Sequence, residues 1–273
     1  MELTFAPLFS GSSGNSVYVG CGDAHLLVDA GVSGAKILSE LAKIGVKPGE
    51  LSGILVTHEH VDHIRSVGIL SRKLDVPVYA TEGTWAAMES KIGEIPERNM
   101  RIFDKRQDFY IGRMEIRAFS LPHDAAEPVG YTFFSGGTRF SVATDIGCVK
   151  ESWLKEIDGS DAVLLESNYD PGMLAAGNYP YLLKQRIASR KGHLANEDAG
   201  EAAVALARRG ARRIILGHLS KENNFPELAL KSCEAAMLQA GIRPGQDVSV
   251  GVALRDGITG LFAIRREEME AFL

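Results

Sequence analysis

The chain has 273 residues, of which 45% are hydrophobic, and its formal net charge is −5. This length and composition predict a globular protein and fit one domain as well as two. We expect one domain over residues 1–273, because no linker, low-complexity tract or charge run marks a boundary. The acidic balance argues against a protein that coats nucleic acid non-specifically, although a local basic groove is compatible with it.

No segment approaches the roughly 20 apolar residues of a membrane span. Residues 1–16 carry no positively charged stretch of the kind that opens a secretory signal. We therefore expect a cytoplasmic protein without a membrane partner. The three cysteines are odd in number and widely spaced, which makes a disulfide framework improbable.

Apolar runs and turn residues predict strands and helices that alternate along most of the chain. Strands are expected at residues 3–9, 16–19, 24–28, 51–56, 76–80, 162–166, 212–216, 248–253 and 261–264, with hairpins at 108–120 and 131–143. Helices are expected at residues 33–44, 64–73, 81–93, 181–190, 196–209 and 226–240. Two groups of strands with helices outside them predict a four-layered αββα sandwich, of class α/β.

A dense group of polar residues, THEHVDH at residues 57–63, follows the predicted strand 51–56. A turn at this point can aim His58 and His60 at one point, while Asp62 and His63 reach a second point nearby. Imidazole and carboxylate ligands suit zinc, manganese or iron, and the lack of cysteine argues against a structural tetrathiolate zinc site. The segment predicts two adjacent divalent metal ions rather than a chance cluster of solvated side chains.

Two metal ions need further ligands, and three residues are placed to supply them. His123, Asp145 and His218 each follow the end of a predicted strand, as the THEHVDH segment does, so we expect their loops to converge. The carboxylate of Asp145 could bridge two cations. His25 lies inside a hydrophobic strand and is expected to be an ordinary core or surface histidine.

The order of these residues resembles the metallo-β-lactamase superfamily. The resemblance implies a four-layered αββα metallo-β-lactamase-like sandwich that holds two metal ions. By this likeness the first ion is bound by His58, His60 and His123, the second by Asp62, His63 and His218, and Asp145 bridges the two.

Several branches of that superfamily fit less well. The commonest class of metallo-β-lactamases has a cysteine at the position of Asp145 and no counterpart of His63. Glyoxalase-like thioesterases and lactonases surround the third ligand with a motif that differs from the LPHDA segment here. The phosphodiesterase and tRNA 3′-processing branch has Gly-Tyr after that histidine, as in the GYTF segment here, and adds a glutamate and a histidine that Glu166 and His193 match.

The pair of Glu166 and His193 suggests a proton donor. A carboxylate that hydrogen-bonds an imidazole raises its proton affinity and holds it ready to protonate a departing alkoxide. In the alternative, His193 only caps the helix expected to begin at Asn196.

The chain lacks room for the extra domain of the β-CASP nucleases or for a long tRNA-gripping arm. With its SGSSGNS loop and LGHLSKEN segment it resembles the YycJ/WalJ subfamily. The resemblance implies a metal-dependent nuclease, with DNA 5′ exonuclease as the expected activity and a metal-bridging hydroxide as the nucleophile. The implied cofactors are two divalent ions, Zn²⁺ or Mn²⁺ with Fe as a further option, and the implied catalytic residues are Asp62, His193 and Glu166.

Other functions stay open at this point. A hydrolase of a small cyclic phosphate, lactone or thioester could use the same ligands. A non-catalytic metal or nucleic-acid binding module is disfavoured by the intact ligand set, and a diiron redox protein by the absence of a flavin domain.

Two groups of residues are candidates for binding a nucleic acid substrate. A backbone-amide nest for a phosphate could form in the SGSSGNS loop, although a plain hairpin turn has the same composition. A phosphate backbone could also contact the basic residues before His193, which a solvated helix face explains equally well. The candidates are Ser12, Ser13, Gly14, Asn15, Lys184, Arg186, Arg190 and Lys191. Asp29 is expected to steady the histidine segment by hydrogen bonding.

Overall fold

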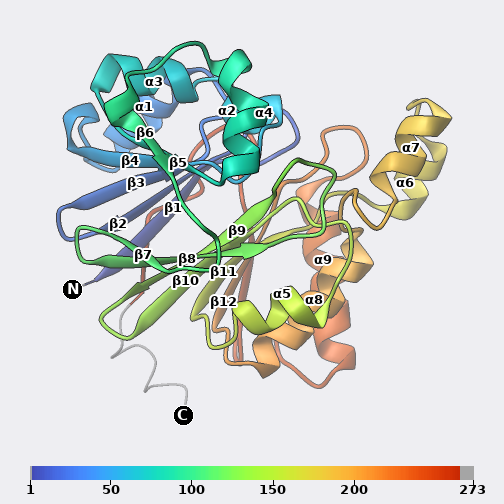
Figure 1. Ribbon diagram of the computed structural model, residues 1–273. Coiled ribbons are helices and arrows are strands. Elements are labelled where there is room, and N and C mark those ends of the chain that lie inside the picture. The colour runs from blue at the N-terminus through green and yellow to red at the C-terminus, as the bar shows by residue number, and fades with distance from the viewer. Residues whose placement is uncertain (1, 265–273) are drawn as a thin grey trace.

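The computed structural model describes residues 2–264, which fold into two mixed β-sheets packed face to face (Figure 1). The first sheet has the order β14 (Phe262–Ile264), β1 (Leu3–Phe9), β2 (Ser16–Cys21), β3 (Ala24–Val28), β4 (Leu51–Leu55), β5 (Val78–Ala80) and β6 (Met100–Ile102). The second has the order β13 (Ser249–Val252), β12 (Arg213–Gly217), β11 (Ala162–Glu166), β10 (Thr138–Ala143), β9 (Val129–Ser135), β8 (Met114–Ser120) and β7 (Phe109–Ile111). Residues 1 and 265–273 of the expected domain lie outside the described residues.

The two sheets have the same plan. In the first, β14, β1, β2 and β3 pair antiparallel, and β3 to β6 pair parallel. In the second, β7 to β10 pair antiparallel and β10 to β13 pair parallel. Ligand sites in such sheets lie beyond the carboxyl ends of parallel strands. The loops that leave β4, β10 and β12 carry the histidine segment, Asp145 and His218.

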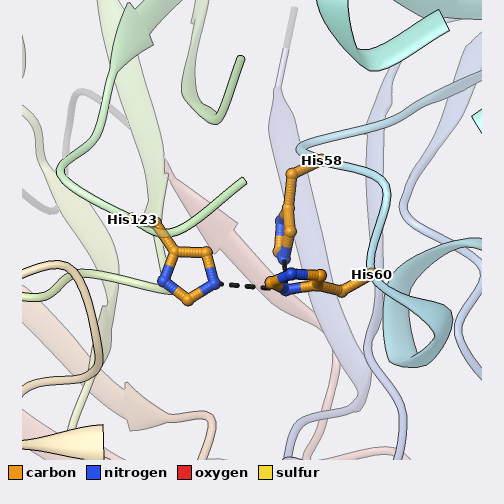
Figure 2. A group of neighbouring side chains, drawn as sticks. All are labelled: His58, His60 and His123. Carbon is orange, nitrogen blue, oxygen red and sulfur yellow. Dashed lines mark hydrogen bonds between the residues drawn. The ribbon is translucent and has the colours of Figure 1, made fainter. Parts of the chain in front are cut away.

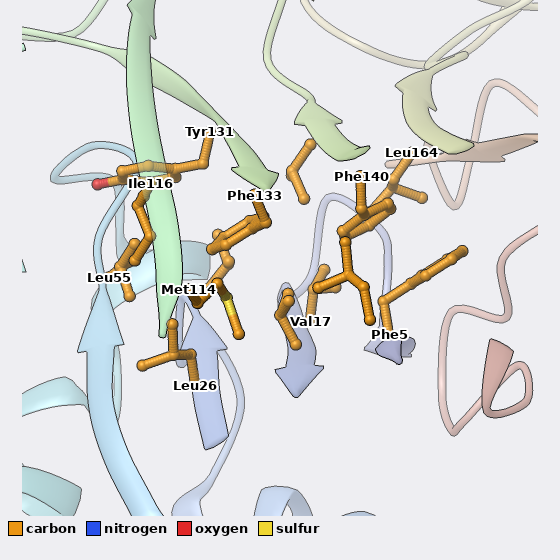
Figure 3. Close-up of a cluster of buried hydrophobic side chains, with 14 of the residues drawn as sticks. Phe5, Val17, Leu26, Leu55, Met114, Ile116, Tyr131, Phe133, Phe140 and Leu164 are labelled. Carbon is orange, nitrogen blue, oxygen red and sulfur yellow. The ribbon is translucent and has the colours of Figure 1, made fainter. Parts of the chain in front are cut away.

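The main core lies between the two sheets, where side chains at alternate strand positions interdigitate (Figure 3). Phe5 of β1 and Phe140 of β10 stack across the interface with ring centroids 3.9 Å apart. Leu26 and Leu55 from the first sheet belong to the same core as Phe133 of β9. This core joins strands that are distant in sequence and holds the strand ends in a common frame.

Helices cover the outer faces of both sheets. On the first sheet pack α1 (Gly34–Lys43), α3 (Val67–Leu74) and α4 (Glu82–Ile92), and on the second α5 (Glu151–Glu156), α8 (Asn196–Arg208) and α9 (Pro226–Gln239). The short helix α2 (Val61–Ile64) lies within the histidine segment, whereas α6 (Pro171–Ala176) and α7 (Tyr181–Ile187) stand out from the sandwich (Figure 1). Within residues 2–264 the chain also forms two 3₁₀ turns, Pro48–Glu50 and Glu97–Asn99. The predicted αββα sandwich is confirmed.

The helix predicted at residues 64–73 is wrong in its first turns. Arg65 and Ser66 separate α2 from α3, because the Ser66 N–H donates to Ala30 O at 2.8 Å instead of continuing the helix. The carbonyl of Asp62, which Ser66 would reach in a continuous helix, accepts from the Asn15 N–H at 2.8 Å. At this break the histidine segment is therefore hydrogen-bonded to the loops that contain Asn15 and Ala30.

The helix predicted at residues 181–190 ends earlier, at Ile187. The chain then turns back, with the His193 N–H donating to Ile187 O at 2.9 Å. A methyl group at Gly192 would lie 2.1 Å from that carbonyl oxygen, so the turn needs glycine. The short elements α5, α6 and β6 are absent from the sequence prediction. Within residues 2–264, no helix combines the length and the apolar character needed to cross a membrane.

Candidate metal centre

Three imidazoles converge beyond the ends of β4 and β8 (Figure 2). His58 Nε2 lies 3.0 Å from His60 Nδ1, and His123 Nε2 lies 3.3 Å from the same atom. A tetrahedral ion with metal–nitrogen bonds of about 2.0–2.1 Å holds its ligand atoms about 3.3 Å apart. The three nitrogen atoms therefore fit a single metal ion.

A second group lies beside the first and consists of Asp62, His63 and His218. Asp62 Oδ2 is 3.6 Å from the Nε2 atom of each of the two histidines. Asp145 lies against both groups, with Oδ2 3.3 Å from His63 Nε2 and Oδ1 3.8 Å from His123 Nε2. The structure thus brings together all seven residues that the sequence singles out as possible ligands.

Two buried polar atoms in this cluster lack a hydrogen-bond partner among the described residues, Asp145 Oδ2 and His218 Nε2. A buried polar atom without a partner costs about 1–3 kcal/mol or more. A cation placed between these atoms would satisfy both of them. Together with the ligand spacing, this observation means that the residues present fit a divalent metal ion.

Hydrogen bonds on the far side of the rings select the nitrogen atom that faces the cluster. His58 Nδ1 donates to Thr57 Oγ1 at 3.0 Å, and that hydroxyl donates to Asp29 Oδ2 at 2.8 Å. His63 Nδ1 donates to the same carboxylate oxygen at 2.8 Å. Because these bonds engage the Nδ1 atoms, the Nε2 atoms of both rings face the cluster. The hydrogen bonding predicted for Asp29 agrees with this arrangement. In the same way, His123 Nδ1 donates to Gly192 O at 3.0 Å.

Burial and mutual proximity shift the titration of these groups. The pKa of His58 lies well below its ordinary value because the ring is buried and has His63 and His123 as neighbours, so the ring stays neutral. Burial also disfavours a charge on His63, but the carboxylates of Asp145, Asp29 and Asp62 prevail and raise its pKa to about 9. The carboxylates thus make this part of the cluster attractive to positive charge.

Glu166 and His193 form the hydrogen-bonded pair that the sequence predicts. Glu166 is fully buried at the end of β11, and its Oε1 accepts from His193 Nδ1 at 2.9 Å. Burial raises the pKa of this carboxyl group, but the imidazoles of His193 and His218 outweigh it and hold the pKa below its usual range. Ala195, not His193, is the N-cap residue of α8, so the alternative capping role is wrong.

One contact of Glu166 is not apparent from the sequence. Its Oε1 also accepts from His218 Nδ1 at 2.7 Å, while Oε2 accepts from the backbone N–H groups of Ile146 and Leu194 at 2.6 and 3.1 Å. A single carboxylate therefore orients both His193 and a residue of the second group. The sequence holds no signal for this sharing, because Glu166 ends β11 whereas His218 lies in the loop after β12.

The SGSSGNS loop has several amides bonded within the protein, and it also reaches the cluster. Gly11 N–H donates to Asn15 Oδ1 at 3.0 Å, Gly14 N–H to Gly11 O at 2.9 Å, and Asn15 N–H to Asp62 O at 2.8 Å. These amides are therefore already bonded within the protein. The loop contacts the second group, because Asn15 Nδ2 lies 3.1 Å from His63 Nε2 and Ser10 Oγ accepts from the His218 N–H at 2.9 Å. Sequence reasoning missed this contact because the glycines and serines of the loop are equally typical of a turn.

Backbone conformation is unusual at three of these positions. Asp29, Asp145 and His218 have φ angles of 62°, 65° and 56°, in the left-handed region that favours glycine. Each residue lies within two positions of the end of a strand. Strained backbone of this kind is typical of functional sites, where the surrounding packing enforces it.

The cluster opens into a cavity of about 390 Å³. Its lining includes the polar residues Ser12, Asn168 and Ser220. Residues 179–187 contribute Tyr179, Leu183, Arg186 and Ile187. The cluster contributes His60, Asp62, Asp145, His193 and His218.

Of the eight predicted substrate-binding residues, Ser12 and Arg186 line this cavity. The Arg186 guanidinium is paired with Asp124 through Nε and Oδ2 at 2.5 Å, and Lys184 Nζ donates to Ala175 O at 2.7 Å. Arg190 and Lys191 are exposed in the turn after α7. His25 lies apart from the cluster, with Nδ1 2.7 Å from the Tyr18 hydroxyl oxygen.

Comparison with known proteins agrees with this geometry. Residues 25–219 match the family described as the beta-lactamase superfamily domain. Exodeoxyribonuclease WalJ of Streptococcus pneumoniae is 42% identical over 262 residues, covering 95% of this chain and 97% of the relative. Exodeoxyribonuclease YycJ of Bacillus anthracis is 42% identical over 246 residues, covering 90% and 93%. The crystal structure of the metallo-beta-lactamase fold protein YhfI of Bacillus subtilis superposes with a TM-score of 0.73 at 17% identity, covering 97% of this chain and all of that one.

Proposed function

Because the chain belongs to the beta-lactamase superfamily and, within it, to the family of WalJ and YycJ, we propose that it is a metal-dependent exodeoxyribonuclease with one hydrolase domain. The family and fold are those of metal-dependent hydrolases, so the chain is a hydrolase. The observation that carries the finer proposal is the joint presence of the complete ligand cluster and the Glu166–His193 pair at one cavity. A ligand cluster of this kind would support many hydrolytic reactions. The Glu166–His193 pair adds a proton donor, which suits a reaction whose leaving group must be protonated.

The proposed ligand set follows the two groups of donor atoms. His58, His60 and His123 would hold one divalent ion, zinc or manganese, and Asp62, His63 and His218 would hold a second, with Asp145 near both groups. Ions bound there would supply a Lewis acid that lowers the pKa of water and offsets the negative charge of a phosphodiester.

The protein's own residues then handle the substrate and the proton. His193 lines the cavity with its side chain 17% exposed, so it can approach the oxygen of a leaving group. The Glu166 carboxylate accepts from Nδ1 and so fixes the orientation of the imidazole. As the bond to phosphorus breaks, His193 donates a proton to the departing oxygen, and a general acid of this kind accelerates hydrolysis about 10²-fold to 10⁴-fold. Asp62 contributes as a ligand at the reacting centre.

A direct assay tests the proposal. The purified protein, reconstituted with manganese or zinc, is incubated with end-labelled single-stranded and double-stranded DNA and with the matching RNA. We expect metal-dependent shortening of DNA from one end, from the 5′ terminus if the expected polarity is right, and none after treatment with a chelator.

Two other outcomes would contradict the proposal. Turnover of a small cyclic phosphate, lactone or thioester without shortening of DNA would assign the same cluster to small-molecule hydrolysis. Internal cuts in a circular single strand would show that a free end is not needed.

A further inference from the structure

The cavity beside the cluster has an apolar wall that neither the metal ligands nor the proton donor explain. Three side chains that line the cavity form what we call the apolar wall: Tyr179, Leu183 and Ile187. The same cavity is also lined by Arg186 and by the polar residues Asn168 and Ser220. A phosphate and a sugar are hydrophilic and gain little from such a surface. A part of the substrate that is flat and apolar would gain much more.

The wall is built on its own small core, apart from the core between the sheets. Tyr179 and Ile187 pack against the buried side chains of Tyr169, Leu174 and Ala195. This packing fixes the side of the wall that faces away from the cavity.

Polar contacts attach α7 to its surroundings as well. Lys184 Nζ donates to Ala175 O, which ties α7 to the end of α6, and Arg186 pairs with Asp124 next to the ligand His123. Asp170, the N-cap residue of α6, accepts from Met173 N–H at 2.7 Å, and its own N–H donates to Asn223 O at 2.8 Å. A wall held in this way is preformed for a ligand and loses little entropy when one binds.

The size of the cavity limits what can reach the wall. Its volume of about 390 Å³ lies near the lower end of the range of about 300–1,000 Å³ that is usual for small-ligand sites. This space is comparable with one nucleotide, so one base at a time can lie against the wall while the rest of the substrate extends out of the open cavity. A paired terminal base would have to leave its partner first, at a cost of a few kcal/mol.

We propose that Tyr179, Leu183 and Ile187 form a nucleobase subsite, which takes the base of the unpaired terminal nucleotide while its phosphodiester lies at the ligand cluster. The inference rests on the proposed nuclease function and adds the form of its substrate: a single-stranded or frayed end. Stacking on an aromatic ring tolerates any base, because every base has a π-face. The subsite therefore selects for an unpaired base and not for a sequence.

A pair of substrates and matched variants tests the subsite. The substrates are a single-stranded oligonucleotide and the same oligonucleotide with an abasic terminal residue. The variants are Tyr179→Ala, Tyr179→Leu, which keeps an apolar side chain on the small core, and the control Tyr181→Ala, since Tyr181 is 72% exposed and does not line the cavity. The fold of each variant is checked by its melting temperature and its metal content.

In the wild type, removal of the terminal base should lower kcat/KM about 10-fold to 100-fold, from the usual strength of base stacking. Tyr179→Ala should show the same loss on the normal substrate, and no further loss on the abasic one. Most of the change should appear in KM, because stacking holds the substrate before and during the reaction. The kcat/KM of Tyr179→Leu on the normal substrate should lie between those of the wild type and Tyr179→Ala. The kcat/KM of Tyr181→Ala should match that of the wild type. An equal effect of base removal in wild type and Tyr179→Ala would overturn the proposal.

A binding measurement separates this inference from the proposed function. The fluorescence of 2-aminopurine deoxyribonucleoside monophosphate is quenched when its base stacks, so titration with wild-type protein should quench it and titration with Tyr179→Ala should not. If no oligonucleotide is hydrolysed but this quenching depends on Tyr179, the exonuclease proposal is wrong and the base subsite stands. Hydrolysis of oligonucleotides with quenching that is equal in both proteins means that the subsite is wrong and the exonuclease proposal stands.

Discussion

Glu166 accepts a hydrogen bond of 2.7 Å from His218 Nδ1 through the same oxygen atom that accepts from His193 Nδ1 at 2.9 Å. The carboxylate therefore links a proposed metal ligand to the proposed proton donor. A change at Glu166 should disturb both of them, whereas a change at His193 should disturb only one.

Glu166→Gln is expected to weaken metal binding as well as catalysis. The variant keeps the volume of the side chain but removes the negative charge that orients His218, and the loss of such a partner usually costs 10–100-fold in metal affinity. Competition with a fluorescent chelator measures that affinity. The control is Asp161→Asn, because Asp161 is a buried carboxylate that precedes the other end of β11 and bonds to the Arg139 N–H. Metal affinity that falls equally in both variants would argue against a specific role of Glu166.

His193→Ala is expected to retain the metal ions and to lose rate. The imidazole donates to Glu166 and lies outside the two proposed ligand groups, so its removal should lower kcat by about 10²-fold to 10⁴-fold. Metal content, measured by mass spectrometry beside the rate, separates this effect from loss of a ligand. His123→Ala is the comparison and should lose metal. If both variants lose metal to the same degree, the proton-donor role is wrong.

Gly31→Ala is expected to disrupt the second ligand group. A methyl group at residue 31 would lie 1.6 Å from the carbonyl oxygen of Asp62, so the backbone that carries Asp62 and His63 must move. Overpacking of this severity costs about 3 kcal/mol or more, and we expect a lower melting temperature and reduced metal content. Gly49→Ala, where the added methyl group meets no atom within 4 Å, should leave both unchanged. A Gly31→Ala protein with normal metal content would contradict this account of the loop contact.

Arg186→Gln should weaken binding of single-stranded DNA more than Lys184→Gln. Arg186 lines the cavity, whereas the Lys184 ammonium donates to the end of α6. Loss of one phosphate contact lowers the slope of log affinity against log salt by about 0.7 for a single strand. Binding can be measured in the His193→Ala background, in which the DNA survives. A slope that does not change in Arg186→Gln would show that its pairing with Asp124 is purely structural.

The three cysteines should differ in reactivity toward a thiol reagent. Burial raises the pKa of Cys233 to about 12, so its thiolate is scarce at pH 8, and Cys21 is buried as well. Cys148 is only partly buried. Titration of the native protein at pH 8 should modify one thiol, and titration in denaturant should modify all three. Rapid modification of a second thiol in the native state would mean that the core around Cys21 or Cys233 opens readily.

The fold and the ligand types could be predicted from the sequence because both depend on local patterns. Alternation of apolar residues predicts most strands, and the spacing of the THEHVDH segment places four donor residues within one strand-to-helix turn. The prediction was less successful at helix ends near the site. Ser66 and Ile187 have ordinary helical neighbours, and only the tertiary contacts of Ala30 and His193 end the helices at those points.

The sequence by itself determined which residues could bind metal and, through its similarity to WalJ and YycJ, the family. The tertiary structure alone decided how these residues are held. The Ser10 hydroxyl bonds to a residue 208 positions away, Glu166 accepts from two histidines on different loops, and the amides of Gly11, Gly14 and Asn15 are bonded within the protein. The same holds for the apolar wall of the cavity. The reason is physical: short-range spacing sets local backbone geometry, whereas contacts between distant loops depend on how two twisted sheets pack, and no local pattern encodes that packing.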